Sequence, residues 1–222
     1  MLCTIIPARS PGEALMLADS SPTRCVEVRA DFMDRPWDAL DAVEALASKG
    51  FFVVATLRLR GEGGLYDGPP IDAVSFSREA LGRGARLVDV DARVLEAYGV
   101  PAGSGVVASI HSETLDNHAV ARAEDLLESG AFEAVKVVGG GGVGEALLAL
   151  KLDMEWKGRA SAFLTGRGWL SVATRAAAEV LGAPIVYGVH EIVESRLPHV
   201  PPISAVIEAL RSWEGGLRWR LG

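Results

Sequence analysis

The sequence contains no glutamine and a single asparagine, Asn117. Side-chain amides are thermolabile and heat-adapted proteins avoid them, so this absence indicates a thermophilic source. Only two cysteines occur, Cys3 and Cys25, each within a short apolar segment. So few cysteines exclude a disulfide-rich scaffold, and no Cys/His spacing is typical of a zinc site. We therefore predict two buried free thiols and no metal.

Basic runs and long hydrophobic stretches are also missing. The net charge is −7 and the isoelectric point is about 5.2, which argues against a nucleic-acid partner. No apolar stretch approaches membrane-spanning length, and the first residues lack the pattern of a signal peptide. We therefore expect no membrane association and a cytoplasmic location. Hydrophobic residues make up 49% of the chain, enough for a full core.

Short apolar segments alternate with longer amphipathic ones along the whole chain. The short segments are rich in valine, isoleucine and phenylalanine, which is typical of buried strands. They span residues 2–6, 25–29, 51–57, 87–90, 106–110, 134–138, 161–164 and 184–187. Helices are predicted over residues 38–49, 117–129, 143–152, 170–181 and 204–213. This rhythm predicts an α/β fold, a (β/α)8 TIM barrel that forms a single domain over residues 1–222, with a doubly wound open sheet as the alternative.

Lysine is scarce, and Lys136 lies in the middle of a predicted buried strand. An ammonium group among valines is costly unless it is paired or loses its proton, and burial lowers the pKa of a lysine. A neutral amine is a nucleophile that forms Schiff bases with ketones. The alternative is a lysine at a strand end whose charged group reaches solvent.

Ionisable residues occur at the ends of five consecutive predicted strands. In an α/β barrel, reactive side chains gather at the carboxyl ends of the strands. The set comprises Glu27, Arg29, Asp31, Arg58, Glu62, Asp89, Asp91, His111 and Lys136. His111 suits the acid–base role that an imine-forming lysine requires, and Glu62 would orient its ring. Arg58 and Arg175 would clamp a substrate carboxylate, because the guanidinium fork matches two oxygens. Glu27 would accept hydrogen bonds from substrate hydroxyls.

These residues lie in motifs that resemble type I 3-dehydroquinate dehydratase, the Schiff-base enzyme of the shikimate pathway. The motifs follow one another in the family's order over nearly the whole chain. They are residues 26–31 (Glu27-x-Arg29-x-Asp31), residues 56–64 (Thr56-x-Arg58-x-x-x-Glu62-Gly-Gly), residues 88–91, Ser109-x-His111, Val135-Lys136-Val137, and Arg175 ahead of the last strand.

The resemblance implies a hydro-lyase that converts 3-dehydroquinate to 3-dehydroshikimate and water. Lys136 would form the Schiff base, His111 would move the protons, and Glu62 would position His111. Glu27, Arg29, Arg58 and Arg175 would bind the anionic substrate. The resemblance also implies a homodimer that needs neither a metal nor an organic cofactor.

The chain departs from the family in the loop after the last strand. A lid glutamine is expected there, but the matching segment, residues 197–204, has proline in its place. His199 or Ser204 would then contact the substrate instead, and Ser204 is assigned to the substrate-binding set.

Three alternative functions remain open. The turn from Gly139 to Gly144 matches the dinucleotide-binding fingerprint, although a run of four glycines matches such patterns easily. The acidic residues that follow, Asp153 and Glu155, fall in the tail of a helix instead of at a strand end. The same turn would suit a Schiff-base aldolase with a phosphorylated substrate. The third alternative is a catalytically silent barrel that acts as a binding protein.

Overall fold

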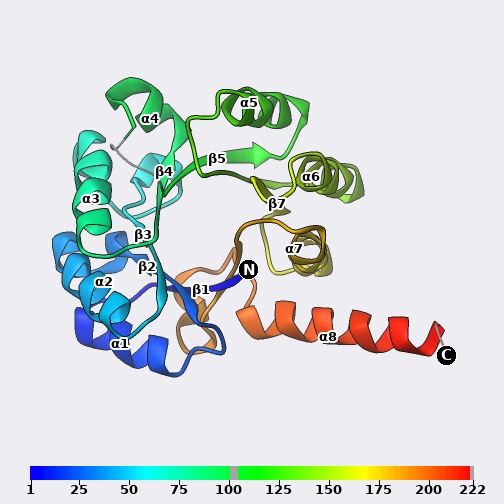
Figure 1. Ribbon diagram of the computed structural model, residues 1–222, viewed down its shortest axis with the longest axis horizontal. Helices are drawn as coiled ribbons and strands as arrows, with labels where there is room; N and C mark the ends of the chain where they lie inside the picture. The colour runs from blue at the N-terminus through cyan, green and yellow to red at the C-terminus, as the bar shows by residue number, and fades with distance from the viewer. Residues whose placement is uncertain (101–104, 221–222) are drawn as a thin grey trace.

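Eight parallel strands alternate with helices in the computed structural model, which describes residues 1–100 and 105–220 (Figure 1). The strands are β1 (Leu2–Ile6), β2 (Cys25–Arg29), β3 (Phe52–Thr56), β4 (Leu87–Asp91), β5 (Val106–Thr114), β6 (Ala134–Gly140), β7 (Ala160–Leu164) and β8 (Val186–Val189). The helices are α1 (Pro11–Asp19), α2 (Ala39–Ser48), α3 (Ile71–Gly82), α4 (Ala92–Tyr98), α5 (Asn117–Glu128), α6 (Val143–Glu155), α7 (Trp169–Leu181) and α8 (Ile203–Arg220). Short 3₁₀ turns include η3 (Arg60–Glu62) and η4 (Glu191–Arg196).

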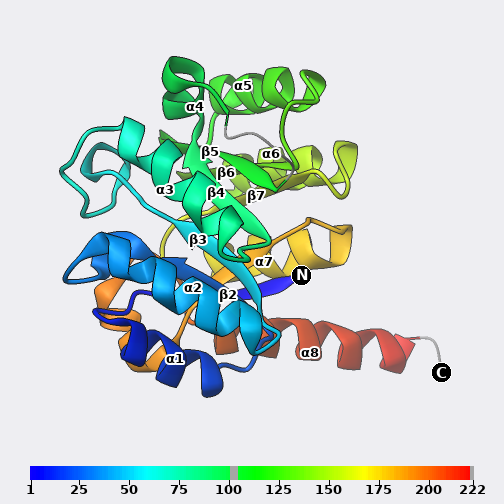
Figure 2. The same cartoon turned by 60° about the vertical axis from the view of Figure 1, so that its left-hand side comes forward.

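The strand order confirms the predicted barrel. Neighbouring strands pair in the order β7-β6-β5-β4-β3-β2-β1-β8, so every strand pairs with the next one in sequence except β7 and β8, which form the two ends of the sheet. This order excludes the doubly wound open sheet, in which the strand order reverses. Between β7 and β8, the amide of Ile185 donates a hydrogen bond of 3.3 Å to Oγ of Ser161. Figure 2 shows the helices on the outer side of the strands.

Alternation along each strand divides the core into two layers. One face of the strands packs against the surrounding helices, as Val26 and Val28 of β2 do. The other face fills the barrel interior, where Cys25, Val54 and Leu87 belong to a separate apolar cluster. This interior cluster leaves the carboxyl ends of the strands free for polar side chains.

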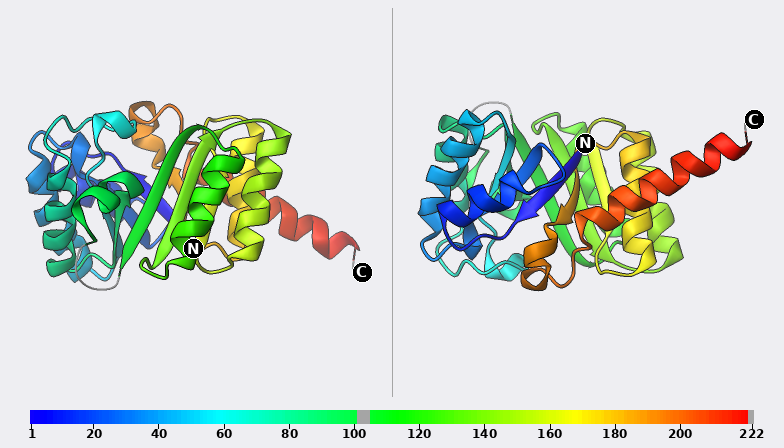
Figure 3. Two further views of the ribbon diagram at one scale, coloured as in Figure 1. Left: turned by 90° about the horizontal axis from the view of Figure 1, so that it is seen from above. Right: turned by 90° about the horizontal axis from the view of Figure 1, so that it is seen from below.

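The predicted strands and helices are all present, with boundary shifts of a few residues. The predicted helix over residues 117–129 begins one residue after its N-cap, Asp116, whose carboxylate accepts a 2.9 Å hydrogen bond from the amide of Ala119. Helices α1, α3 and α4 were not predicted. Figure 3 shows α8 extending beyond the barrel. Within the described residues, none of the helices combines the length and the apolar character needed to cross a bilayer.

The prediction of two free thiols is wrong, because Cys3 and Cys25 form a disulfide. The two residues are register partners on β1 and β2, with Cα atoms 4.5 Å apart, and both side chains face the barrel interior. That proximity depends on the parallel register of two strands separated by α1. Cysteine count and spacing contain no information about this register.

We expect the disulfide to contribute substantially to stability. It closes a loop over a sequence separation of 22 residues, for which the loss of chain entropy in the unfolded state amounts to about 3 kcal/mol. A Cys3→Ala/Cys25→Ala variant should therefore unfold at a lower urea concentration than the oxidised wild type. Wild type denatured and refolded under reducing conditions should match the variant. Equal midpoints for the oxidised protein and the variant would contradict this expectation.

Asp153 is a buried carboxyl group between α6 and β7. Its Oδ1 accepts a 2.8 Å hydrogen bond from the amide of Ala162, and its Oδ2 has no partner among the described residues. Burial raises the pKa of Asp153 to about 8 from its usual 3.8. A folded-state pKa above the unfolded value gives a contribution to stability that is fully present below pH 3.8 and is lost as the pH rises toward 8.

An Asp153→Asn variant should accordingly gain stability over wild type as the pH increases. The gain should grow by up to about 1.4 kcal/mol per pH unit between pH 5 and pH 8 and then level off. Urea denaturation at pH 5, 7 and 9 measures it, with the exposed Asp125→Asn as the matched control. The same pH dependence in both variants would rule out a buried, protonated Asp153.

Candidate active site

A cavity of about 210 Å³ lies at the carboxyl ends of the strands. Seven of the eight predicted site residues line it: Glu27, Arg29, Arg58, Glu62, His111, Lys136 and Arg175. The convergence follows from the barrel, since each of the contributing strands ends at the same rim. Ser204 is not brought there. It is exposed at the start of α8, and its amide donates a 2.8 Å hydrogen bond to Oε1 of Glu191.

Lys136 is buried in the middle of β6, with 6% of its surface exposed. Its Nζ forms an ion pair with Oδ2 of Asp89 and lies 4.9 Å from the ring centre of Tyr187. Burial lowers the pKa of Lys136, and the carboxylate of Asp89 partly opposes that shift. The alternative of a lysine that reaches solvent is therefore excluded, and Asp89 is the partner that the sequence did not identify.

Asp89 joins Lys136 to Arg58 beneath the cavity. Its Oδ1 accepts a 2.5 Å hydrogen bond from Nη2 of Arg58. Burial by itself would raise the pKa of Asp89, but the charges of Arg58 and Lys136 outweigh it and hold this pKa well below its usual range. Nη1 of Arg58 also donates to Oγ of Ser109 at 3.0 Å and to Oε2 of Glu62 at 3.5 Å. Arg58 therefore binds groups of the protein itself, and it holds the side chains of Asp89, Ser109 and Glu62 together beneath the cavity.

Arg175 is a buried cation, and the part of the chain that the structure describes offers it no counter-ion. It is 2% exposed, and its guanidinium donates to the carbonyl oxygens of Tyr187, Leu164 and Ser171 and to the hydroxyl of Ser171. Within the described residues, no carboxylate lies within 4.0 Å of it. Burial lowers the pKa of Arg175 to about 9. An anionic ligand in the cavity would supply the missing charge, so Arg175 is the stronger candidate for a carboxylate-binding residue.

His111 lies at the rim with 24% of its side chain exposed. Its Nδ1 is 3.4 Å from Nη1 of Arg58 and 3.9 Å from Oδ2 of Asp91. Burial, followed by the charge of Arg58, lowers the pKa of His111 to about 3. The imidazole is therefore neutral at pH 7 and able to accept a proton.

Glu27 and Arg29 enter the cavity from β2. Oε1 of Glu27 accepts a 2.7 Å hydrogen bond from the hydroxyl of Thr56, which fixes the carboxylate. The guanidinium of Arg29 binds both carboxylate oxygens of Asp31 at 2.8 Å. The side chain of Glu62 contacts Arg58 and the amide of Leu59, at 3.5 and 3.4 Å, and lies beyond 4.0 Å of both His111 nitrogens.

Two further residues of the cavity wall had no place in the predicted set. Tyr187 of β8 is buried, and its hydroxyl has no hydrogen-bond partner among the described residues. His199 was considered only as a substitute for the lid glutamine, and it does line the cavity. Its carbonyl oxygen accepts a 2.7 Å hydrogen bond from the amide of Gly166, which joins the loop after β8 to the loop after β7. The sequence feature that could have identified Tyr187 as a cavity residue is its position at the end of the last predicted strand.

The glycine-rich turn follows β6 and precedes α6, but the anion position at its helix N-terminus is occupied. The amide of Gly142 donates a 2.7 Å hydrogen bond to Oε2 of Glu145 in the same helix. A dinucleotide or phosphate would have to displace that carboxylate. Among residues 1–100 and 105–220, no group of three or more His, Cys, Asp and Glu side chains is arranged to hold a metal ion.

Comparison with known proteins agrees with this geometry. The chain matches no protein-family model. It is 36% identical over 223 residues to 3-dehydroquinate dehydratase from Aeropyrum pernix, covering 93% of each chain. The fold resembles type I 3-dehydroquinate dehydratase from Clostridium difficile, with a TM-score of 0.72 and 16% identity over 97% of this chain and 92% of that one. It also resembles the Geobacillus kaustophilus 3-dehydroquinate dehydratase, with a TM-score of 0.71 and 20% identity over 96% and 91% of the two chains. The chain therefore belongs to the 3-dehydroquinate dehydratase family, and its fold is that of the type I enzymes.

Proposed function

We propose that the protein is a hydro-lyase that dehydrates 3-dehydroquinate to 3-dehydroshikimate through a Schiff base on Lys136. The observation that carries the proposal is one cavity that combines a buried amine, a neutral imidazole and an uncompensated guanidinium. Each group matches one requirement of the reaction: imine formation, proton transfer and binding of a carboxylate.

The reaction begins at Nζ of Lys136. The amine, having released its proton, attacks the ring ketone and forms a carbinolamine, which loses water to give an iminium ion. The iminium carries the positive charge that the ammonium had, so Asp89 remains its counter-ion. Arg58 holds Asp89 in place from the other side. The iminium withdraws electrons and acidifies the neighbouring C–H bond.

His111 then transfers the proton. Its neutral ring accepts a proton from the carbon next to the iminium carbon, and the electron pair of that C–H bond forms an enamine. The enamine then expels the hydroxyl group on the following carbon. The imidazolium gives its proton to this hydroxyl, which leaves as water. A second water molecule hydrolyses the iminium, releases 3-dehydroshikimate and restores Lys136.

The remaining polar residues bind the substrate. Arg175, which is buried and has no carboxylate within 4.0 Å among the described residues, pairs with the ring carboxylate. Glu27 and Arg29 contact ring hydroxyl groups. Arg58 and Glu62 act as a pair that maintains the charges around Asp89 and His111. Tyr187 offers a free hydroxyl to substrate or water.

Turnover of 3-dehydroquinate by the purified protein tests this function. We expect a conjugated enone product, followed by its ultraviolet absorbance and identified by NMR. Carbon–carbon cleavage of a phosphorylated ketose would instead favour the aldolase alternative. If 3-dehydroquinate causes no turnover and no thermal shift, the result would favour the catalytically silent barrel.

We further propose one catalytic domain that acts as a homodimer in the cytoplasm without a nucleic-acid partner. Val143, Leu147 and Met154 of α6 are 59–63% exposed and offer an apolar face for a second copy. The net charge of −7 would repel nucleic acid. Cytoplasmic disulfides persist in hyperthermophiles, which is compatible with the scarcity of amides. Light scattering should give twice the chain mass of 23.4 kDa, and a monomer mass would contradict the dimer.

A further inference from the structure

One nitrogen of the His111 ring lies between a hydrogen-bond donor and an acceptor. Nδ1 is 3.4 Å from Nη1 of Arg58 and 3.9 Å from Oδ2 of Asp91. A neutral imidazole carries one proton, on either Nδ1 or Nε2. A ring that accepts from Arg58 at Nδ1 has its proton on Nε2 and no accessible base. A ring that directs Nδ1–H toward Asp91 leaves Nε2 free to accept a substrate proton.

Asp91 is held firmly in the position that the second arrangement requires. It ends β4 and caps α4, with its Oδ1 accepting hydrogen bonds from the backbone amide of Arg93 at 2.9 Å and from Nε of Arg93 at 3.0 Å. Oδ2 accepts from Nη2 of Arg93 at 3.3 Å. Burial would raise the pKa of Asp91, but the nearby His111 ring and the hydrogen bonds from Arg93 hold it well below its usual range. The side chain is therefore an anion fixed beside the imidazole.

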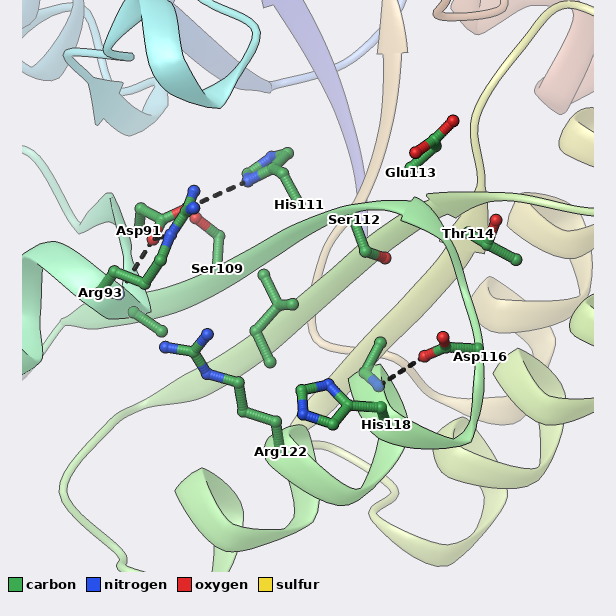
Figure 4. A pocket seen from close by; sticks show the side chains of 13 residues that line it. Asp91, Arg93, Ser109, His111, Ser112, Glu113, Thr114, Asp116, His118 and Arg122 are labelled. Carbon is green, nitrogen blue, oxygen red and sulfur yellow. Dashed lines mark hydrogen bonds and ion pairs between the residues drawn. The ribbon is translucent and has the colours of Figure 1, made fainter.

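Figure 4 shows Asp91, the last residue of β4, joined by a dashed line to His111, which lies within β5. They border a second hollow of about 320 Å³ between β5 and α5, which shares His111 and Ser112 with the active-site cavity. Among the described residues, Asp91 is the one carboxylate with an oxygen within 4.0 Å of a His111 nitrogen. Catalytic hydrogen bonds are commonly long in unliganded enzymes and shorten when substrate binds.

We propose that Asp91 is the positioning residue of His111: it selects the tautomer with the proton on Nδ1 and balances the imidazolium that forms during proton transfer. The proposal rests on the proposed dehydratase function. The sequence predicted that Glu62 would position His111, but the carboxylate of Glu62 contacts Arg58 instead. Asp91 requires no contact with the substrate, because it acts through the ring.

The charges around His111 determine what removal of Asp91 does. Arg58 from the end of β3 and Lys136 from β6 oppose protonation of the ring, while Asp89 and Asp91 of β4 favour it. An Asp91→Asn variant removes one of the two carboxylates that favour the imidazolium, while Arg93 of α4 and Glu62 of η3 remain beside this position. The imidazolium becomes less stable, so the acidic limb of the kcat–pH profile should move to lower pH.

Asp91→Asn keeps the size of the side chain and its ability to cap α4. We expect kcat to fall by about 100-fold, within the range for general acid–base catalysis, with KM changed by less than about threefold. The Schiff base on Lys136 should still be trapped by borohydride in the presence of 3-dehydroquinate. The ¹⁵N shifts of His111 should report a proton on Nδ1 in wild type and on Nε2 in the variant. Asp91→Glu should restore the wild-type tautomer and part of the activity.

Asp116→Asn is the matched control, because Asp116 caps α5 of the next β/α unit by the same kind of contact. Its kcat should stay within about twofold of wild type. A wild-type ring protonated on Nε2, or an Asp91→Asn variant with wild-type kcat, would overturn the proposal. The tautomer is read without turnover, so a wild type that lacks dehydratase activity refutes the proposed function separately.

Discussion

Lys136→Met should lose dehydration activity by at least about 10⁴-fold and form no covalent adduct with 3-dehydroquinate. The methionine keeps an unbranched stem against the ring of Tyr187 but has no amine, so neither the carbinolamine nor the iminium forms. Loss of a nucleophile typically removes most of the rate enhancement, leaving what binding and orientation supply. Steady-state kinetics measure the loss.

The matched control is Lys151→Met, which removes an amine from an exposed position on α6 where Lys151 pairs with Glu155 at 3.7 Å. Its activity should equal that of wild type. Circular dichroism should show that both variants are folded. A Lys136→Met variant that retains more than a few per cent of wild-type kcat would show that catalysis does not proceed through this amine.

Asp89→Asn should produce the largest loss of stability, with an unfolding free energy lower by about 3–5 kcal/mol. Asp89 is 1% exposed and is the shared anion of Lys136 and Arg58. Without its charge, two buried cations face each other with no counter-ion between them. Activity should fall as well, since the iminium ion loses the carboxylate that balances it.

The pH dependence of the two proteins should differ in the acidic range. The folded-state pKa of Asp89 lies below its usual 3.8, so its contribution is present above pH 3.8 and is lost as the pH falls below that value. Wild type should therefore lose more stability than Asp89→Asn on acidification. Asp67→Asn, which breaks the exposed pair with Arg60, should leave stability unchanged in the same urea titrations. Equal stability of Asp89→Asn and wild type would contradict the buried ion network.

The barrel could be predicted from the sequence because its strands are short, rich in valine and regularly spaced. Their inner and outer faces are both buried, as the consecutive buried residues 53–55 of β3 show, so apolar runs identify them. Helix α1 was missed although Ser10 as its N-cap, Pro11 at its first position and Glu13 in its first turn form a helix-start signal. Helix α3 was missed where it follows Pro70. Helix α4 has only seven residues, too few to show a helical period.

The sequence predicted which residues line the active-site cavity, but it did not predict which of them contact one another. Residues on the inner face of the strands converge in any barrel, which brought Glu27, His111 and Lys136 into one cavity. The partner of Lys136 lies on β4, two strands away, so the barrel's stagger decides that pairing. Likewise, nothing in the sequence distinguishes Arg58, which pairs with Asp89 and Glu62, from Arg175, which has no carboxylate within 4.0 Å among the described residues.

Reduction with borohydride in the presence of 3-dehydroquinate, followed by peptide mapping, tests the central claim most directly. The amine of Lys136 should carry the reduced substrate adduct at one equivalent per chain, and the other three lysines should remain unmodified. An adduct on another lysine, or dehydration at full rate with no adduct trapped, would contradict the account.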